Sequence, residues 1–171
     1  MNRIAVLIVM VAVFVVNTSF YANSKGGFYV VIDKSDYELM VYDAEGWLST
    51  YPIVFGNDDL GDKMVQGDRK TPEGTFTITH KKPHAKWNRY MGIDYPNAES
   101  IERFNNRKAR GIIPMNAKIG GDIGIHGTWP HEDYAIDQYQ NWTLGCISLK
   151  NEHVEQLYRM LGVGTKVVIK R

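Results

Sequence analysis

Residues 28–56 read FYVVIDKSDYELMVYDAEGWLSTYPIVFG and decide the fold class. Three runs rich in β-branched and aromatic residues, 28–33, 37–42 and 47–55, are separated by turn-like segments at 34–36 and 43–46. This pattern predicts a β-meander. Further strands are expected at 75–80, 123–125 and 165–169, and the polar segment 56–74, with four glycines, is expected to form a loop over one end of the sheet.

Helical signals are few. Val154, Leu157, Tyr158 and Leu161 recur at helical spacing, with Asn151 as a plausible N-cap and Gly162 as a stop, and a second short helix is possible at 98–105. The residues therefore predict a mostly β domain with one or two short helices.

The composition fits a single folded domain. The chain has 171 residues, of which 44% are hydrophobic and 23% charged. Its 20 basic and 19 acidic residues nearly cancel, so the charge balance gives no indication of nucleic acid as a partner.

Residues 1–22 resemble an export signal. Arg3 precedes an apolar run from Ile4 to Val16, whose 13 residues would form a helix of roughly 20 Å, shorter than the ~30 Å core of a bilayer. Because Asn17 and Phe20 make a poor cleavage site, an uncleaved N-terminal anchor is the alternative. We therefore expect an exported protein of the periplasm or cell envelope, with its domain at 23–171.

Cys146 is the only cysteine, which is unusual for an exported protein, where cysteines are commonly paired. It is either a reactive thiol or a small buried residue. His126 ends a short apolar strand and precedes Gly127, and Cys146 follows 20 positions after His126. A strand–loop–strand return would bring the imidazole beside the thiol, and the N–H groups of Gly145 and Cys146 are candidate donors to an oxyanion.

Zinc bound by His126, His131 and Cys146 is an alternative interpretation of the same residues. The chain contains no HxxxH, HxH or CxxC spacing, and this argues against a metal site.

The segments IGIHGT at 123–128 and WTLGCISL at 142–149 resemble the signature of the L,D-transpeptidase catalytic domain, the YkuD domain. That signature is a histidine-glycine pair followed, after a spacer, by serine or threonine, any residue, glycine and cysteine. GDRKTPEGTFTI at 67–78, the hairpin at 39–58 and YMGIDYPN at 90–97 are also similar to segments of this family. The resemblance extends over residues 28–171 and implies a sandwich- or barrel-like β fold.

The resemblance implies an enzyme acting on peptidoglycan stem peptides without a metal or organic cofactor. Cys146 would attack the carbonyl of meso-diaminopimelate and release D-alanine, with His126 as proton acceptor and the Gly127 carbonyl orienting the imidazole. An acceptor amine would then give a 3–3 cross-link or attach a lipoprotein to the wall, whereas water would give a carboxypeptidase or hydrolase. A carbapenem is the implied covalent inhibitor, and a non-catalytic peptidoglycan-binding module is the remaining alternative.

One position departs from the family pattern. Most members have arginine two positions after the cysteine, where this chain has Ser148. Arg107, Lys108 and Arg110 are candidates to supply the missing charge, although a solvated basic run is an equal alternative. The predicted substrate-binding residues are Thr143, Ser148, Trp142, Arg110 and Tyr90.

Four aromatic residues crowd the loop between His126 and Cys146: Trp129, Tyr134, Tyr139 and Trp142. They would form either a lid that excludes water or a packed loop without a moving part.

Overall fold

Short apolar runs with alternating burial build the first two strands of the computed structural model, which describes residues 27–171. Strands β1 (Tyr29–Asp33), β2 (Glu38–Asp43) and β3 (Gly46–Pro52) pair antiparallel in succession, which confirms the meander. Val30 and Ile32 of β1 and Leu39 and Val41 of β2 are fully buried. Their spacing of two places them on the inner face of the sheet.

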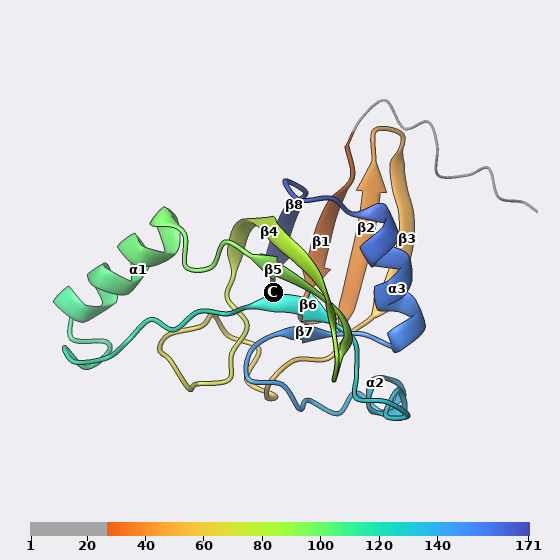
Figure 1. Cartoon of the computed structure of the whole chain (residues 1–171). Helices are drawn as coiled ribbons and strands as arrows, with labels where there is room; N and C mark the ends of the chain where they lie inside the picture. The colour runs from red at the N-terminus through yellow and green to blue at the C-terminus, as the bar shows by residue number, and fades with distance from the viewer. Residues whose placement is uncertain (1–26) are drawn as a thin grey trace, which may run out of the picture.

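The last strand of the chain lies near the middle of the sheet. β8 (Lys166–Lys170) runs parallel to β1 and antiparallel to β4 (Gly74–His84), and its Val167 and Ile169 are buried. The eight strands follow the order β3-β2-β1-β8-β4-β5-β6-β7. β8 therefore connects the meander to the half of the sheet that begins at β4 (Figure 1).

β5 (Asn88–Ile93), β6 (Gly124–His126) and β7 (Ile147–Ser148) complete the second half of the sheet. β4 pairs with both β8 and β5, and its register shifts between Ile78 and His80. Beyond β3, Val54 and Ser148 exchange backbone hydrogen bonds of 3.0 and 2.9 Å in an isolated antiparallel bridge. This bridge joins the two ends of the strand order, so the sheet closes on itself in the expected barrel-like manner.

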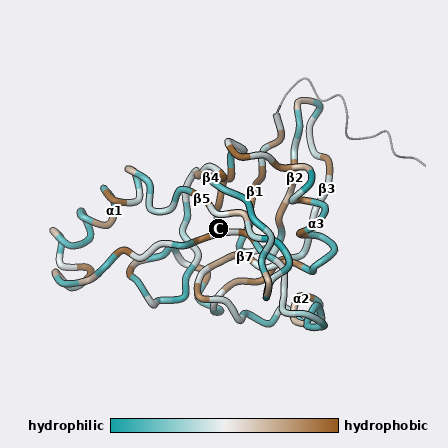
Figure 2. The backbone as a smooth tube through the Cα atoms, in the orientation of Figure 1, coloured by the Kyte–Doolittle hydropathy of each residue, from teal (hydrophilic) through white to brown (hydrophobic). Residues whose placement is uncertain are grey.

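Three short helices accompany the sheet. α3 (Asn151–Met160) buries Val154 and Leu157 in the core, α2 (Tyr134–Asp137) is a single turn, and α1 (Ala98–Ala109) extends away from the sheet (Figure 1). Hydrophobic residues follow the strands of the meander, whereas α1 is largely hydrophilic (Figure 2). The mostly β expectation is confirmed, with the one-turn α2 as an additional helix.

Two local expectations are corrected. β5 was not expected because Tyr90, Met91 and Ile93 are all buried, so its sequence lacks the alternation of a half-exposed strand. Asn151 is the first residue of α3 rather than its N-cap, which is Lys150. The Asn151 side chain instead donates hydrogen bonds to Thr128 and Asp133.

A buried lysine attaches the long loop after β3 to β1. The Lys34 side chain is 1% exposed, and its Nζ lies 2.7 Å from Glu73 Oε1. The same ammonium donates to the carbonyl oxygens of Gly61 (3.2 Å) and Thr71 (3.3 Å). Burial lowers the pKa of Lys34, and the Glu73 carboxylate opposes that effect. Lys34 thus fixes both ends of the 61–73 segment.

The signal or anchor expected at residues 1–22 lies outside the described residues. Between residues 27 and 171, the helices are too short and too polar to span a bilayer.

Candidate active site

Parallel pairing of β6 with β7 brings His126 close to Cys146. Ile125 is opposite Ile147 and His126 is opposite Ser148. Because side chains alternate along a strand, Cys146 faces the same side of the sheet as His126. Both residues line one cleft of about 680 Å³.

Two glycines make room for two of the rings that line this cleft. Lys82, Tyr90 and His126 are successive cross-strand partners, and Gly92 and Gly124 lie in the adjoining row. A Cβ on Gly92 would lie 2.2 Å from the ring of His80, and a Cβ on Gly124 would lie 2.6 Å from the ring of Tyr90. The two glycines therefore leave the space that the aromatic rings occupy.

The His126 imidazole is 1% exposed and held from three sides. Its Nδ1 lies 2.7 Å from the Gly127 carbonyl oxygen, Trp87 stacks on it at 4.4 Å between ring centroids, and Trp142 meets it edge-on at 5.5 Å. Burial lowers the pKa of His126 to about 4, so the ring is neutral at pH 7. In the neutral ring, Nδ1–H donates to Gly127 and Nε2 keeps the lone pair that accepts a proton.

Trp87 was not among the expected site residues. It is the last residue of the β4–β5 turn, in a segment without clear periodicity, and no local signal connects it to His126.

Ser148 supports the carbonyl that holds the imidazole. Its Oγ donates to the Gly127 oxygen at 3.3 Å, and the residue is fully buried and does not line the cleft. The structure therefore does not place Ser148 in the cleft, because its buried hydroxyl is bonded to the Gly127 carbonyl, and the expected contact with substrate stays a prediction. Gly127 itself has no room for a Cβ, which would lie 2.5 Å from Asn151 Oδ1.

The Cys146 thiol is partly exposed and donates to the Asp122 carbonyl at 3.4 Å. The Tyr90 hydroxyl donates to the same oxygen at 3.2 Å. Burial raises the pKa of Cys146 to about 11, although the Gly124 N–H beside the sulfur opposes this shift. The thiol is therefore protonated at pH 7 and needs a base. Asp122, which adopts a left-handed φ of 57°, was not predicted from the sequence.

Thr143 organises the turn that precedes Cys146. The Gly145 N–H donates to Thr143 Oγ1 at 3.1 Å, and this hydroxyl donates to the Cys146 carbonyl at 2.8 Å. Gly145 is thus not a free oxyanion donor here, which corrects that part of the expectation. Within residues 27–171, no acceptor is bonded to the Cys146 N–H, so this donor remains available.

Gly145 is required at its position for a steric reason. Its φ is 125°, and an added Cβ would lie 2.8 Å from the Lys70 carbonyl oxygen. The turn therefore lies close against the 61–73 segment.

The basic residues of α1 do not reach the cleft. Arg107 pairs with Asp62 and donates to the Lys63 carbonyl at 2.9 Å, and Arg110 is exposed at the C-cap of α1. The structure does not place Arg110 in the cleft, because α1 projects away from the site (Figure 1), and nothing here supports its expected role in substrate binding. The lysines and arginines that line the cleft are Lys63, Arg69 and Lys82.

Of the four aromatic residues between His126 and Cys146, Trp142 lines the cleft. Trp129 packs edge-on against Trp87 at 6.4 Å, and Tyr139 packs against Tyr37 at 5.5 Å. Tyr134 and Tyr139 are about half exposed, at 52% and 55%. This arrangement favours the packed loop over a four-residue lid.

In the part of the chain that the structure describes, no three His, Cys, Asp or Glu side chains are grouped as metal ligands. His131 is exposed and does not line the cleft.

The closed mixed sheet and its cleft are those of a YkuD domain. The family model of the L,D-transpeptidase catalytic domain, YkuD, matches residues 27–169. The chain belongs to this family, as its sequence motifs implied.

Several relatives share the domain. YqjB of Bacillus subtilis (strain 168), whose name assigns it to the L,D-transpeptidases, is 29% identical over 143 residues, which are 82% of this chain and 70% of YqjB. The structure of Pgp2, a helical cell shape determining protein of Campylobacter jejuni, is 26% identical with a TM-score of 0.62, over 85% of this chain and 48% of Pgp2. LdtMt1, an L,D-transpeptidase solved with imipenem, shares the fold at 17% identity and a TM-score of 0.52, over 85% of this chain and 59% of LdtMt1.

The chain spans about half the length of Pgp2 and of further curated relatives from Escherichia coli, 48% and 43% for two of them.

Proposed function

We propose that the chain is a peptidoglycan L,D-transpeptidase with Cys146 as nucleophile and His126 as general base. The observation that carries this proposal is that the single thiol and a buried neutral imidazole line one cleft on the same face of paired strands. Membership of the L,D-transpeptidase family supports the reaction class.

The proposed acylation step begins with two uncharged partners. His126 Nε2 takes the thiol proton as Sγ bonds to the carbonyl carbon of meso-diaminopimelate, and the Cys146 N–H donates to the resulting oxyanion. The C–N bond then breaks, the imidazolium returns its proton to the leaving amine of D-alanine, and a thioester remains. The Gly127 carbonyl, which lies 2.7 Å from Nδ1, stabilises the transient imidazolium.

The thioester is resolved by an acceptor. An amine of a second stem peptide attacks it, passes a proton to Nε2 and restores the thiol, which gives a 3–3 cross-link. An amine of a wall-attached lipoprotein is the alternative acceptor. Hydrolysis by an L,D-carboxypeptidase is a second candidate, because the Cys146 side chain is partly exposed and water has access to a thioester there.

We further propose that residues 1–22 direct the chain to the periplasm or cell envelope, either as a cleaved signal or as an anchor. The basic residue Arg3 followed by an apolar run is typical of an export signal and supports this proposal. Cell fractionation followed by N-terminal sequencing of the protein separates cleavage from anchoring, and recovery of the intact chain in the cytoplasm would overturn the proposal. A contribution to cell shape, the process named for Pgp2, would follow from cross-linking in the envelope.

Acylation by a carbapenem tests the nucleophile. The imipenem complex of LdtMt1 makes this compound a suitable probe. We expect the wild-type protein to gain the mass of one imipenem and Cys146→Ala to gain none. Incubation with disaccharide-tetrapeptide then distinguishes the activities: a 3–3 dimer indicates transfer, and tripeptide alone indicates hydrolysis. Peptide binding without adduct or product would instead identify a non-catalytic wall-binding module.

A further inference from the structure

The cleft carries more positive than negative charge. Its lining includes Lys63, Arg69 and Lys82 but a single carboxylate, that of Asp122. Lys63 is neutralised locally, because its Nζ lies 2.7 Å from Asp68 and the side chain is 3% exposed. Arg69 and Lys82 are both exposed and form no ion pair within residues 27–171. These two cations are therefore available to an anionic ligand.

The backbone around Arg69 is fixed more firmly than that of an ordinary loop. Arg69 adopts a left-handed φ of 58°, a conformation that residues with a side chain rarely adopt without support from their surroundings. Contacts on both sides hold this conformation: Asn57 Nδ2 donates to the Asp68 carbonyl at 2.8 Å, and the Lys70 N–H donates to the Asp68 carboxylate at 3.0 Å. A Cβ on Gly56 would lie 2.1 Å from the Arg69 carbonyl oxygen, so only glycine permits this close packing.

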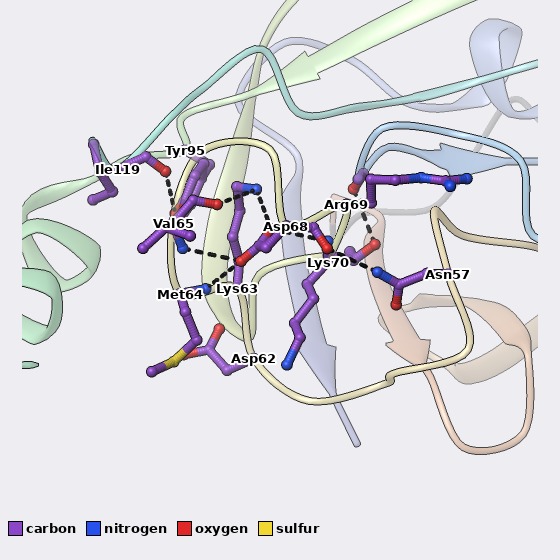
Figure 3. Close-up of polar contacts among 12 residues, drawn as sticks. Asn57, Asp62, Lys63, Met64, Val65, Asp68, Arg69, Lys70, Tyr95 and Ile119 are labelled. Atoms are coloured by element: carbon purple, nitrogen blue, oxygen red, sulfur yellow. Dashed lines mark hydrogen bonds and ion pairs between the residues drawn. The ribbon is translucent and has the colours of Figure 1, made fainter. Parts of the chain in front are cut away.

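The Asp68 carboxylate is the centre of this loop. It also accepts the N–H groups of Met64 (2.7 Å) and Val65 (3.0 Å), as Figure 3 shows. Burial by itself would raise the pKa of Asp68, but hydrogen bonds from Lys63 and from the backbone hold it below its ordinary value. The carboxylate therefore stays ionised and keeps the loop rigid. The Arg69 side chain extends away from this cluster (Figure 3).

A hydrogen bond orients the Arg69 guanidinium beside the turn that precedes Cys146. Its Nε–H donates to the Thr143 carbonyl at 3.2 Å, three positions before Cys146. Among the described residues, no acceptor is bonded to its two terminal amino groups. A planar guanidinium with both amino groups free matches the geometry of a carboxylate, whereas an exposed lysine such as Lys82 offers only a flexible point charge.

We propose that Arg69 binds a carboxylate of the donor peptide and positions that peptide for attack by Cys146. The inference rests on the proposed function. It assigns to Arg69 of the 61–73 loop the positive charge that most family members carry at the position of Ser148. A tetrapeptide stem carries carboxylates on its terminal D-alanine and on the side chain of meso-diaminopimelate, and either group is a chemically suitable ligand.

Binding measurements in the Cys146→Ala background test this proposal independently of turnover. Calorimetry with disaccharide-tetrapeptide is compared with calorimetry on two analogues, each with one of the two carboxylates amidated. We expect amidation of one carboxylate to raise the Kd at least tenfold, and Arg69→Gln to raise the Kd of the native peptide by a similar factor. With Arg69→Gln, amidation of that carboxylate should have no further effect. Arg69→Lys should recover part of the affinity.

Arg159→Gln is the matched control, because it removes the same charge from an exposed arginine of α3 outside the cleft. It should bind native and amidated peptides as the parent does. If Arg69→Gln weakens binding but leaves the full penalty for amidation, Arg69 acts only by supporting Thr143 and the proposal is wrong. Absence of measurable binding to any peptide would also overturn it. If the wild-type protein shows no turnover while the Arg69-dependent preference for the native carboxylate persists, the proposed enzymatic function is wrong and the proposed binding site stands.

Discussion

Cys146 and His126 are both uncharged near pH 7, since burial raises the pKa of the thiol to about 11 and lowers that of the imidazole to about 4. An ion pair between thiolate and imidazolium would require the opposite order of pKa values. The free protein therefore carries the proton on sulfur, and in the proposed mechanism this proton is transferred only as the bond to carbon forms. The Asp122 carbonyl, which accepts the thiol at 3.4 Å, favours the same protonation state.

The first prediction at this scale concerns pH. The thiolate fraction should rise about tenfold per pH unit below the pKa, so alkylation of Cys146 by iodoacetamide should accelerate steadily from pH 7 to pH 10. A free thiol of ordinary pKa, such as glutathione, serves as control and should level off above about pH 9. Adduct formation followed by mass spectrometry gives the rates. A rate that is flat between pH 6 and pH 9 would indicate a preformed ion pair.

The second prediction concerns Gly124, which packs against the ring of Tyr90 in the cleft wall. In Gly124→Ala the added Cβ would lie 2.6 Å from the Tyr90 ring and 2.7 Å from the Met91 carbonyl oxygen. We expect the free energy of unfolding to fall by about 1–3 kcal/mol and imipenem acylation to slow, because the ring moves into the cleft. In Gly162→Ala no atom lies within 4 Å of the new methyl group, so its stability should change little. Urea denaturation of both variants measures the difference, and equal midpoints would contradict the argument.

At the scale of elements, the 61–73 segment is held by polar contacts rather than by a strand or helix. Lys34, the residue that follows β1, binds Glu73 and the carbonyl groups of Gly61 and Thr71. On the other side of the segment, Thr71 Oγ1 donates to the Gly145 carbonyl at 2.9 Å. The loop thus connects the central sheet to the turn that precedes Cys146. Its order depends on buried partners, which a sequence rich in glycine and charge does not reveal.

Lys34→Met tests this connection. The substitution leaves Glu73 and two carbonyl groups without their donor, and we expect a loss of about 1–3 kcal/mol in the free energy of unfolding. Lys118→Met, at an exposed lysine, should change it by less than about 0.5 kcal/mol. Denaturant titration followed by fluorescence measures both. A Lys34→Met protein as stable as the parent would show that the ion pair contributes no net stability, as some buried pairs do not.

At the scale of the whole molecule, the last strand joins the two halves of the sheet. β8 pairs with β1 on one side and with β4 on the other, and Val167 and Ile169 are buried between them. The Val54–Ser148 bridge closes the opposite side. The cleft is lined by the loop between β3 and β4 and by the half of the sheet that begins at β4. We expect it to form only when both connections are made, because that loop is held against the end of β1 through Lys34.

Removal of residues 166–171 should therefore abolish cooperative thermal unfolding and the imipenem adduct together. The loss leaves the hydrogen-bonding edges of β1 and β4 unpaired and exposes the core. Removal of Arg171 alone, which is exposed beyond β8, should leave both properties unchanged. Circular dichroism and intact-mass measurements on the two truncated proteins provide the comparison. A truncated protein that still melts cooperatively would place the folding unit elsewhere.

Local sequence determined much of this protein. The β-branched and aromatic runs in 28–56, with the turns between them, specified the meander. Helical spacing specified α3, and the motifs around His126 and Cys146 specified the family. These features depend on neighbours within a few positions, or on residue types at fixed spacing, so they can be read from the sequence without knowledge of the fold.

Only the tertiary structure decided how the site residues are used. It buried Ser148 under Gly127, occupied the Gly145 N–H, separated Arg110 from the cleft and placed Arg69 in it. Arg69 reaches the Thr143 carbonyl across 74 positions of sequence, and Asp122 reaches Cys146 across 24. Hydrogen bonds and burial at such separations depend on which segments pack together, and neither periodicity nor local propensity contains that information.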